Sequence, residues 1–249
     1  MARDSENRSW IKAQWGAPPW IKAGISTRNG GHSQSPFNSL NVAMHVGDNP
    51  ETVGLNRKYL RDLLALPAEP VWLDQIHGNK IIQLGEKNNP QADGSYTNKS
   101  GVVCAIMTAD CIPVLLCDTK GTIVAAVHVG WRGYCAGIIA KVLGIFSMPK
   151  SDILVWIGPH ISASNYEVGD DVYHSCVDRD RGVSKFFTKS PSGRWYANLE
   201  MMVQHELMAD NVTNITSSNS CTFRLNADFF SYRRDNITGR MASMIWIDK

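Results

Sequence analysis

The sequence of 249 residues lacks an excess of charge of either sign. Its 25 lysine and arginine residues face 23 aspartate and glutamate residues, so the formal net charge is only +2. Proteins that bind nucleic acids or membrane surfaces by long-range electrostatics usually carry a clear basic excess. We therefore expect neither a nucleic acid nor a membrane as a partner, and in the absence of such a partner we expect a monomer.

Long apolar segments are missing as well. Residues 1–8 lack the apolar core of a secretory signal peptide, and no window of about 18 apolar residues is present. We therefore expect a cytoplasmic protein whose six cysteines stay reduced. Internal repeats, low-complexity tracts and an obvious linker are also absent, which favours a single domain over residues 1–249.

The sequence does contain many short apolar segments of the kind that form strands. Strands are expected at residues 20–26, 71–76, 80–84, 152–158 and 241–247. The apolar segments 102–117 and 122–129 flank a turn sequence at 118–121, which predicts a β-hairpin. Helices are expected after Pro50 and over residues 134–146, 170–177 and 198–209, and a long loop is expected over residues 85–100. Because strands outnumber helices, we expect a mixed α+β fold.

Three residues that can bind a soft metal ion lie at expected strand ends or turns, namely His77, Cys111 and His128. If Thr119 and Lys120 form the hairpin loop, Cys111 lies directly opposite His128, with Cβ atoms about 4.5–5.5 Å apart. Both side chains then reach one zinc ion. Three protein ligands with a fourth position left open are typical of a catalytic zinc site.

Other interpretations of these residues stay open at this point. Gly121 can form a bulge that shifts the register by one residue and turns Cys111 and His128 to opposite faces. Pro113 indicates a bulge or an edge close to Cys111. The cysteine and the histidines can also be ordinary core residues, or a Cys–His nucleophilic pair that works without a metal ion.

Residues 130–133, Gly-Trp-Arg-Gly, are expected to join a strand to the start of a helix. The glycines allow close approach to the backbone, and the free N–H groups at a helix N-terminus favour an anion. Arg132 adds positive charge at this point. A plain strand-to-helix turn explains the same residues equally well.

Several short motifs follow one another between residues 20 and 247. They are Ser26-Thr27-Arg28-Asn29-Gly30-Gly31, Ser39-Leu40-Asn41, Gln75-Ile76-His77, Thr108-Ala109-Asp110-Cys111-Ile112-Pro113-Val114, His128-Val129-Gly130-Trp131-Arg132-Gly133, Gly158-Pro159, Tyr166-Glu167-Val168-Gly169, Cys221-Thr222, Phe230-Ser231-Tyr232-Arg233-Arg234-Asp235 and Thr238-Gly239-Arg240. In content and order they resemble the YfiH-like family, also called the laccase-domain or multicopper polyphenol oxidase family. The motifs at residues 108–114 and 128–133 are the most specific.

The resemblance implies one domain built as a four-layer α/β/β/α sandwich, similar in fold to the catalytic domain of cytotoxic necrotizing factor toxins. It also implies that His77, Cys111 and His128 hold one zinc ion per chain, with Cys111 and His128 on one face of the hairpin. Members are described as purine nucleoside phosphorylases that also deaminate adenosine, as copper-dependent polyphenol oxidases, and as a peptidoglycan editing factor.

The first hypothesis is a zinc-dependent purine nucleoside phosphorylase for adenosine, inosine and methylthioadenosine, with adenosine deaminase side activity. Its partners are then small molecules, a purine nucleoside and phosphate. Zinc can lower the pKa of bound water toward about 7, which serves deamination. Asp110 is expected to orient a ligand histidine. Candidates for binding the substrate or phosphate are Arg28, Asn41, Arg132, Arg233 and Arg240, and loss of Arg132 is expected to harm phosphorolysis more than deamination.

The second hypothesis is a copper-dependent, laccase-like oxidase, because one cysteine and two histidines also accept copper. Reduction of oxygen by several electrons needs several copper ions, however, and the spare histidines have unrelated spacings. They are His32, His45, His160, His174 and His205. Copper binding is therefore expected only in vitro.

A third hypothesis is a hydrolase for an amide of a cytoplasmic peptidoglycan precursor, acting through zinc or through Cys111 as nucleophile. A fourth hypothesis is a binding protein without enzymatic activity.

Overall fold

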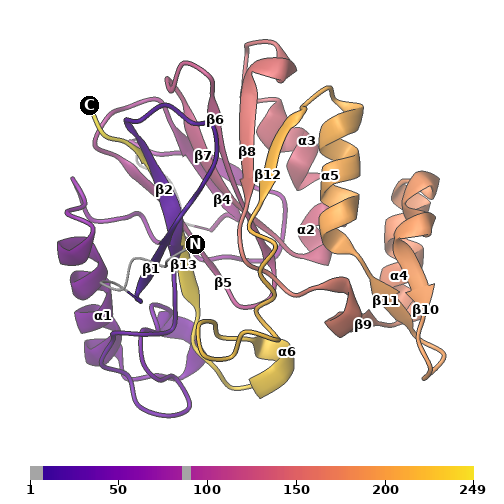
Figure 1. The fold of residues 1–249 in the computed structure, drawn as a ribbon, viewed down its shortest axis with the longest axis horizontal. Coiled ribbons are helices and arrows are strands. Elements are labelled where there is room, and N and C mark those ends of the chain that lie inside the picture. Colours follow the sequence, from indigo (N-terminus) through magenta and orange to yellow (C-terminus); the bar gives the residue numbers. More distant parts are fainter. Residues whose placement is uncertain (1–7, 86–90) are drawn as a thin grey trace.

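The computed structural model describes residues 8–85 and 91–249. Within them, two large β-sheets pack face to face and helices cover both outer faces (Figure 1). The four-stranded sheet has the order β1-β2-β13-β5, with bounds Trp10–Lys12, Ile21–Ser26, Met241–Ile247 and Val103–Thr108. The six-stranded sheet has the order β12-β8-β6-β7-β4-β3, with bounds Asn214–Ser217, Ile153–Ile157, Ile112–Asp118, Val124–Val129, Gly94–Thr97 and Ile81–Gln83.

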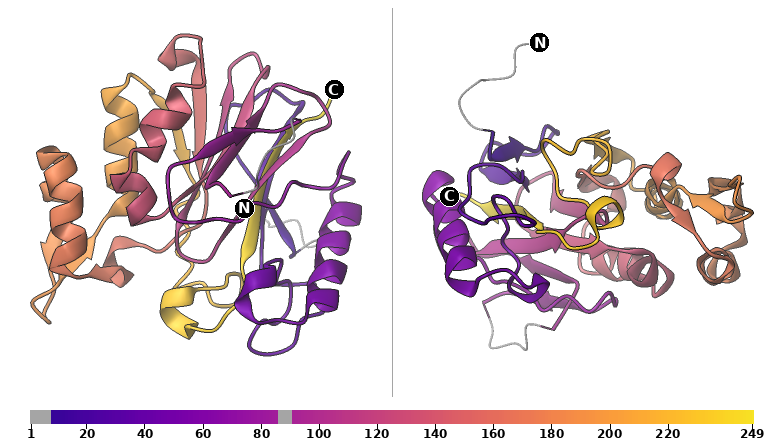
Figure 2. Two further views of the ribbon diagram at one scale, coloured as in Figure 1. Left: turned by 180° about the vertical axis from the view of Figure 1, so that it is seen from behind. Right: turned by 90° about the horizontal axis from the view of Figure 1, so that it is seen from below.

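The helices divide between the two outer faces, as Figure 2 shows from two further directions. Helix α1 (Pro50–Leu63) packs on the four-stranded sheet, whereas α2 (Trp131–Cys135), α3 (Ile138–Leu143) and α5 (Leu199–Ala209) pack on the six-stranded sheet. Beyond α5 lies an extension made of α4 (Asp170–Arg179) and a small sheet of β9 (Glu167–Val168), β10 (Phe187–Lys189) and β11 (Trp195–Ala197).

Shorter helical segments complete the described chain. They are the 3-10 turns Met44–Val46, Lys150–Asp152, Ala163–Asn165 and Arg181–Phe186, and α6, Tyr232–Asp235. Across residues 8–85 and 91–249, none of the helices has both the length and the apolar character needed to cross a membrane.

Successive side chains of the central strands point to opposite faces, which produces the layers. In β6, Val114 and Leu116 join the core beneath the helices, whereas Leu115 and Cys117 join the core between the two sheets. Ile106 of β5 lies in the same inter-sheet core. The predicted α/β/β/α sandwich is therefore confirmed.

Local signals explain the elements that the sequence predicted well. The side chain of Asn49 accepts hydrogen bonds from the backbone N–H groups of Glu51 and Thr52, and Pro50 occupies the first helical position of α1. Strand β13 has the predicted bounds. The single helix expected over residues 134–146 is instead divided into α2 and α3, because Gly137 adopts a left-handed conformation with φ of 82°.

The apolar segment 102–117 is not one strand of a hairpin. Its first part, β5, belongs to the four-stranded sheet, and its second part begins β6 of the six-stranded sheet. Ala109, Asp110 and Cys111 form the crossing between the sheets, where Asp110 has a positive φ of 88°. Cys111 therefore stands at a sheet crossing, next to the first residue of β6.

The hairpin of β6 and β7 also has a different register from the predicted one. His128 pairs with Pro113, so Cys111 lies two residues beyond the position opposite His128. The connection spans residues 119–123 and is longer than the predicted two-residue loop, and the Asp118 carboxylate closes it by accepting hydrogen bonds from the backbone N–H groups of Thr122 and Ile123. A shift of two residues keeps Cys111 on the face of His128, whereas the one-residue bulge would have separated them.

Two further expectations about residues 71–100 are wrong. Residues 71–76 form no regular strand and contribute only isolated bridges, at Val71 and Asp74. The expected loop contains β4, which pairs with β7 and β3, while residues 86–90 lie outside the described chain. Strand β4 escaped prediction because Ser95 and Thr97 are polar although they are buried.

Candidate functional site

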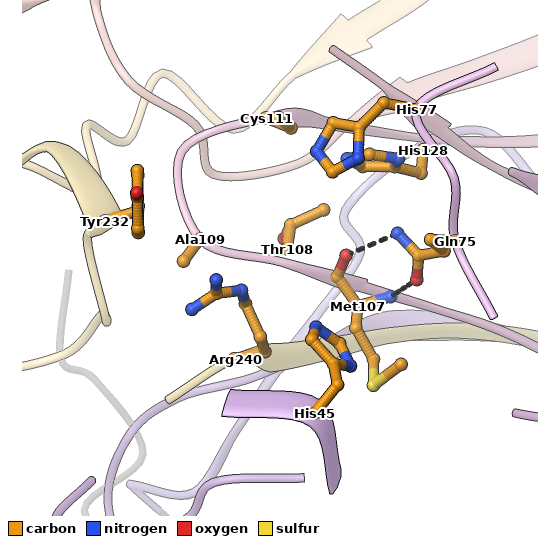
Figure 3. Close-up of a pocket in the computed structure, with 10 residues that line it drawn as sticks. All are labelled: His45, Gln75, His77, Met107, Thr108, Ala109, Cys111, His128, Tyr232 and Arg240. Atoms are coloured by element: carbon orange, nitrogen blue, oxygen red, sulfur yellow. Dashed lines mark hydrogen bonds between the residues drawn. The ribbon is translucent and has the colours of Figure 1, made fainter. Parts of the chain in front are cut away.

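Three distant segments bring His77, Cys111 and His128 together. Their ligand atoms all lie within 4.8 Å of one another. His77 precedes β3 and is exposed, with a left-handed φ of 57°; Cys111 stands at the sheet crossing; and His128 lies in β7 and is buried. The histidine rings meet edge to face, with centroids 4.8 Å apart. Figure 3 shows the three side chains along one side of a cavity.

Asp93 fixes two of these three residues. Its buried carboxylate accepts a hydrogen bond from Nδ1 of His128 at 2.9 Å and from the backbone N–H groups of His77 and Gly78 at 2.9 and 2.6 Å. Because Nδ1 of His128 is used by Asp93, Nε2 is the nitrogen that remains for a metal ion. Sequence reasoning gave this role to Asp110, but the structure gives it to Asp93.

The surroundings of Cys111 favour its thiolate. Burial by itself would raise the pKa of the Cys111 thiol, but the charge of His128 and hydrogen bonds with His128 and His77 lower that pKa to about 6. Metal ions bind the thiolate form of cysteine and the neutral form of histidine, so metal binding would displace a proton from His128 and leave the Cys111 thiolate to the ion. By contrast, burial raises the pKa of Cys104 to about 12, and it also raises the pKa of Cys117. The core-residue interpretation therefore fits Cys104 and Cys117 but not Cys111.

The donor set and the space around it fit a metal ion such as zinc, whose bonds to nitrogen and sulfur are about 2.0–2.3 Å long. Gly130 helps to keep that space free. A Cβ atom at Gly130 would lie 3.2 Å from Sγ of Cys111 and 3.5 Å from Cδ2 of His77. Across residues 8–85 and 91–249, this is the one group of three His, Cys, Asp or Glu side chains arranged to hold a metal.

Replacing Gly130 with alanine is expected to weaken zinc binding roughly 10-fold, because the new methyl group presses on two ligands. Stability should change by less than about 1 kcal/mol, since Gly130 has an extended backbone that alanine also adopts, with φ of −89°. Competition with a chelator measures the affinity. Gly54→Ala is the matched control, because a Cβ atom there meets nothing within 4 Å. Equal zinc affinity in both variants would contradict the role of Gly130.

Two cavities meet at His77 and Cys111, and His128 lines the larger of them. The larger cavity, of about 400 Å³, is lined by polar groups that include His45, Gln75, Thr108 and Arg240 (Figure 3). The amide nitrogen of Gln75 donates a hydrogen bond to the carbonyl oxygen of Met107 at 2.8 Å, and its amide oxygen accepts one from the backbone N–H of Met107 at 2.6 Å. These two bonds anchor the His77 segment to β5.

The smaller cavity, of about 180 Å³, is lined mainly by apolar and aromatic side chains, among them Trp131, Ile161, Tyr166 and Leu199. His77, Cys111 and Tyr232 line both cavities. A metal ion on the three ligands would therefore face both a polar and an apolar compartment.

The predicted substrate residues are spread over different surroundings. Arg240 lines the larger cavity and Arg233 the smaller one. Asn41 is buried, and its Oδ1 accepts a hydrogen bond from the backbone N–H of Arg240 at 3.0 Å, so it supports Arg240 rather than a ligand. Arg28 lines neither cavity and donates to the carbonyl oxygens of Asn38 and Asn226.

Arg132 and Asp110 are also placed differently from the sequence expectation. Arg132 is exposed, lies over the ring of Trp131 at 4.4 Å and lines neither cavity, and the helix that follows Gly130 is a short one. The Asp110 carboxylate accepts hydrogen bonds from the hydroxyl of Thr222 at 2.6 Å and the backbone N–H of Arg233 at 2.7 Å. Asp110 therefore holds the Arg233 segment against the sheet crossing.

Sequence reasoning missed three residues that the structure brings to this site. Asp93 fell within the loop expected over residues 85–100, His45 was counted only as a spare histidine, and Thr108 was seen only as a part of a motif. A sequence signal existed for Thr108 alone, since it begins the Thr-Ala-Asp-Cys motif. The roles of Asp93 and His45 depend on contacts between segments that no local pattern reveals.

Comparison with known proteins places these features in a family. A family model described as "Multi-copper polyphenol oxidoreductase laccase" matches residues 22–248. The chain belongs to this YfiH-like family. A family member from Escherichia coli (strain K12), "Purine nucleoside phosphorylase YfiH", is 44% identical over 239 residues, which cover 95% of this chain and 98% of that protein. "Purine nucleoside phosphorylase PA4543" from Pseudomonas aeruginosa is 40% identical, with 96% and 98% covered.

Solved structures of the YfiH-like family agree with the fold. The Neisseria meningitidis protein NMB0706 superposes with a TM-score of 0.92 at 40% identity, covering 97% of this chain and 100% of that one. YlmD from Geobacillus stearothermophilus superposes with a TM-score of 0.87 at 32% identity, covering 99% and 98%. The match extends over almost the whole chain in each case.

Proposed function

We propose that this YfiH-like protein is a zinc-dependent purine nucleoside phosphorylase that cleaves adenosine, inosine and methylthioadenosine with phosphate and deaminates adenosine more slowly at the same site. The observation that carries the proposal is the cluster of His77, Cys111 and His128 at the junction of a polar and an apolar cavity. The names of the curated relatives support the phosphorylase reaction.

The two cavities suit the two ends of a purine nucleoside. An apolar compartment with aromatic walls at Trp131 and Tyr166 suits a purine base, because flat rings stack on one another and displace water. A polar compartment suits the hydroxyl groups of ribose and an anion. The volume of the larger cavity, even without the smaller one, lies within the usual range of about 300–1,000 Å³ for small-molecule sites.

The side chains divide the work at the metal centre. Zinc, when bound, supplies a Lewis acid and a means of lowering the pKa of water. Asp93 holds His128 in one tautomer, and Cys111 contributes a negative charge that balances part of the charge of the ion. Gln75 keeps the His77 segment in place on β5.

A multicopper oxidase is less well supported than a phosphorylase. Such an enzyme needs several copper ions, and the described residues offer one group of three ligands. His32, His45, His160, His174 and His205 do not belong to that group. His160, for example, is buried, and its Nε2 lies 3.2 Å from a carboxylate oxygen of Glu200.

The deciding experiment compares adenosine conversion with and without inorganic phosphate, using protein purified without added metal. We expect phosphate-dependent release of adenine and ribose 1-phosphate, and slower formation of inosine that does not depend on phosphate. Equal release of adenine without phosphate would make the protein a hydrolase. If adenosine is not converted under either condition, the proposal of a purine nucleoside phosphorylase is rejected. The hypothesis of a hydrolase for an amide of a peptidoglycan precursor is then favoured.

A further inference from the structure

A buried hydroxyl without a partner marks the larger cavity. Thr108 is only 1% exposed, lines this cavity, and its Oγ1 has no hydrogen-bond partner. Five other buried side-chain oxygens in the described chain also lack a partner, and none of them belongs to a residue that lines this cavity or the smaller one. Buried hydroxyls are normally satisfied, so the position of Thr108 points to a ligand that brings a polar atom.

Arg240 brings a positive charge that has no direct ion-pair partner to the same cavity. One of its terminal nitrogens, Nη1, donates to the carbonyl oxygens of Thr238 and Gly239, at 2.9 and 3.0 Å. Within residues 8–85 and 91–249, no carboxylate lies within 4.0 Å of its guanidinium, whereas Arg179 and Arg234 each pair with one. A half-buried guanidinium without a directly paired carboxylate suits an anionic ligand, because its remaining N–H groups form a planar fork for phosphate oxygens.

The surroundings hold Arg240 in place for such a ligand. Asn41 accepts a hydrogen bond from the backbone N–H of Arg240 and is itself bonded to the carboxylate of Asp48 at 2.9 Å. Figure 3 shows His45 and Arg240 on one side of the cavity, the three metal-binding candidates on the opposite side, and Thr108 between the two groups. A ligand held by His45, Thr108 and Arg240 therefore faces the metal centre.

We propose that Arg240, Thr108 and His45 form the site of the phosphate that attacks the nucleoside. This inference rests on the phosphorylase function proposed above. In the reaction, an oxygen of hydrogen phosphate bonds C1′ of ribose while the bond from C1′ to N9 of the purine breaks. The electron pair of that bond goes to the purine, and the proton of hydrogen phosphate goes to N9. The larger cavity, rather than the turn at Arg132, supplies the anion site.

The test uses Arg240→Gln, which removes the charge and shortens the side chain, and Thr108→Val, which removes the hydroxyl with little change in volume. Each is expected to raise the KM for phosphate, by about 10- to 150-fold for Arg240→Gln and about 3- to 10-fold for Thr108→Val, and phosphorolysis should fall more than deamination. Arg132→Gln is the matched control and should leave the KM for phosphate unchanged. An unchanged KM in both cavity variants, or a raised KM in Arg132→Gln, would overturn the assignment.

A binding measurement separates this inference from the proposed reaction. Inorganic phosphate should raise the melting temperature of the zinc-loaded wild-type protein and of Arg132→Gln, but not that of Arg240→Gln. If adenosine is not cleaved and this pattern is still seen, the anion site stands and the phosphorylase function fails. If phosphate stabilises Arg240→Gln as much as the wild type, the anion site fails whatever the reaction is.

Discussion

Replacing Cys111 with alanine is expected to abolish stoichiometric zinc and to reduce both phosphorolysis and deamination by at least about 1,000-fold. The reason is that a metal ion contributes several kcal/mol to such reactions, and each 1.36 kcal/mol corresponds to a factor of about 10. Metal analysis should find one zinc per chain in the wild type and much less than one in the variant. The fold should persist, because the site leaves a position open for chemistry rather than closing the metal into the core.

Cys117→Ala is the matched control for Cys111→Ala. Cys117 lies in β6, the strand that directly follows Cys111, but in the core between the sheets, where burial raises the pKa of its thiol. This variant should lose a little stability and keep its zinc and its activity. One zinc per chain in Cys111→Ala would show that the metal assignment is wrong, and full activity in that variant would place the chemistry elsewhere.

The second large effect is expected for Asp93→Asn. The amide cannot accept all the hydrogen bonds that reach the Asp93 carboxylate from the His77 segment and from His128. Zinc affinity should fall about 10- to 100-fold, as for other groups that orient a ligand histidine. The free energy of unfolding should fall by roughly 3 kcal/mol, because hydrogen bonds to a charged group are lost in the interior. Chelator competition and urea unfolding measure the two effects.

Asp118→Asn separates the two effects of Asp93→Asn. Asp118 is also buried and accepts hydrogen bonds from Thr122 and Ile123, but it lies at the far end of β6 from Cys111. This variant should lose stability and keep its zinc affinity. If the two variants lose zinc affinity equally, the loss reflects general destabilisation, and the specific role of Asp93 is rejected.

The architecture was predictable where one short segment determines it. Asn49 and Pro50 define the start of α1, and the apolar residues of β13 define a strand. The division of residues 102–117 between two sheets was not predictable, because β5 and β6 are buried on both faces and show no alternation of polar and apolar residues. The register of the hairpin depended on Asp118, whose side chain closes a longer loop.

The site was predictable for the residues whose chemistry is distinctive. His77, Cys111 and His128 were found because few side chains bind soft metal ions, although the predicted contact between Cys111 and His128 rested on the wrong register. Arg132 was emphasised because it follows a glycine turn, yet its side chain lies on Trp131 at the surface. The importance of Asp93 and Thr108 arises from burial and from partners far away in the chain, which a sequence pattern does not contain.

The position of β13 affects the order in which this molecule can assemble. Strand β13 is the last strand of the chain and lies between β2 and β5, which are far from it in the sequence, so the four-stranded sheet closes only through contacts between distant parts of the chain. Arg240 directly precedes β13, and Cys111 follows β5 across the sheet crossing. We therefore expect both cavity walls to become ordered only after β13 has paired with β2 and β5. Folding dominated by such distant contacts is slow, and a nascent chain that has not yet inserted β13 lacks a formed pocket in which to capture either the metal or the anion.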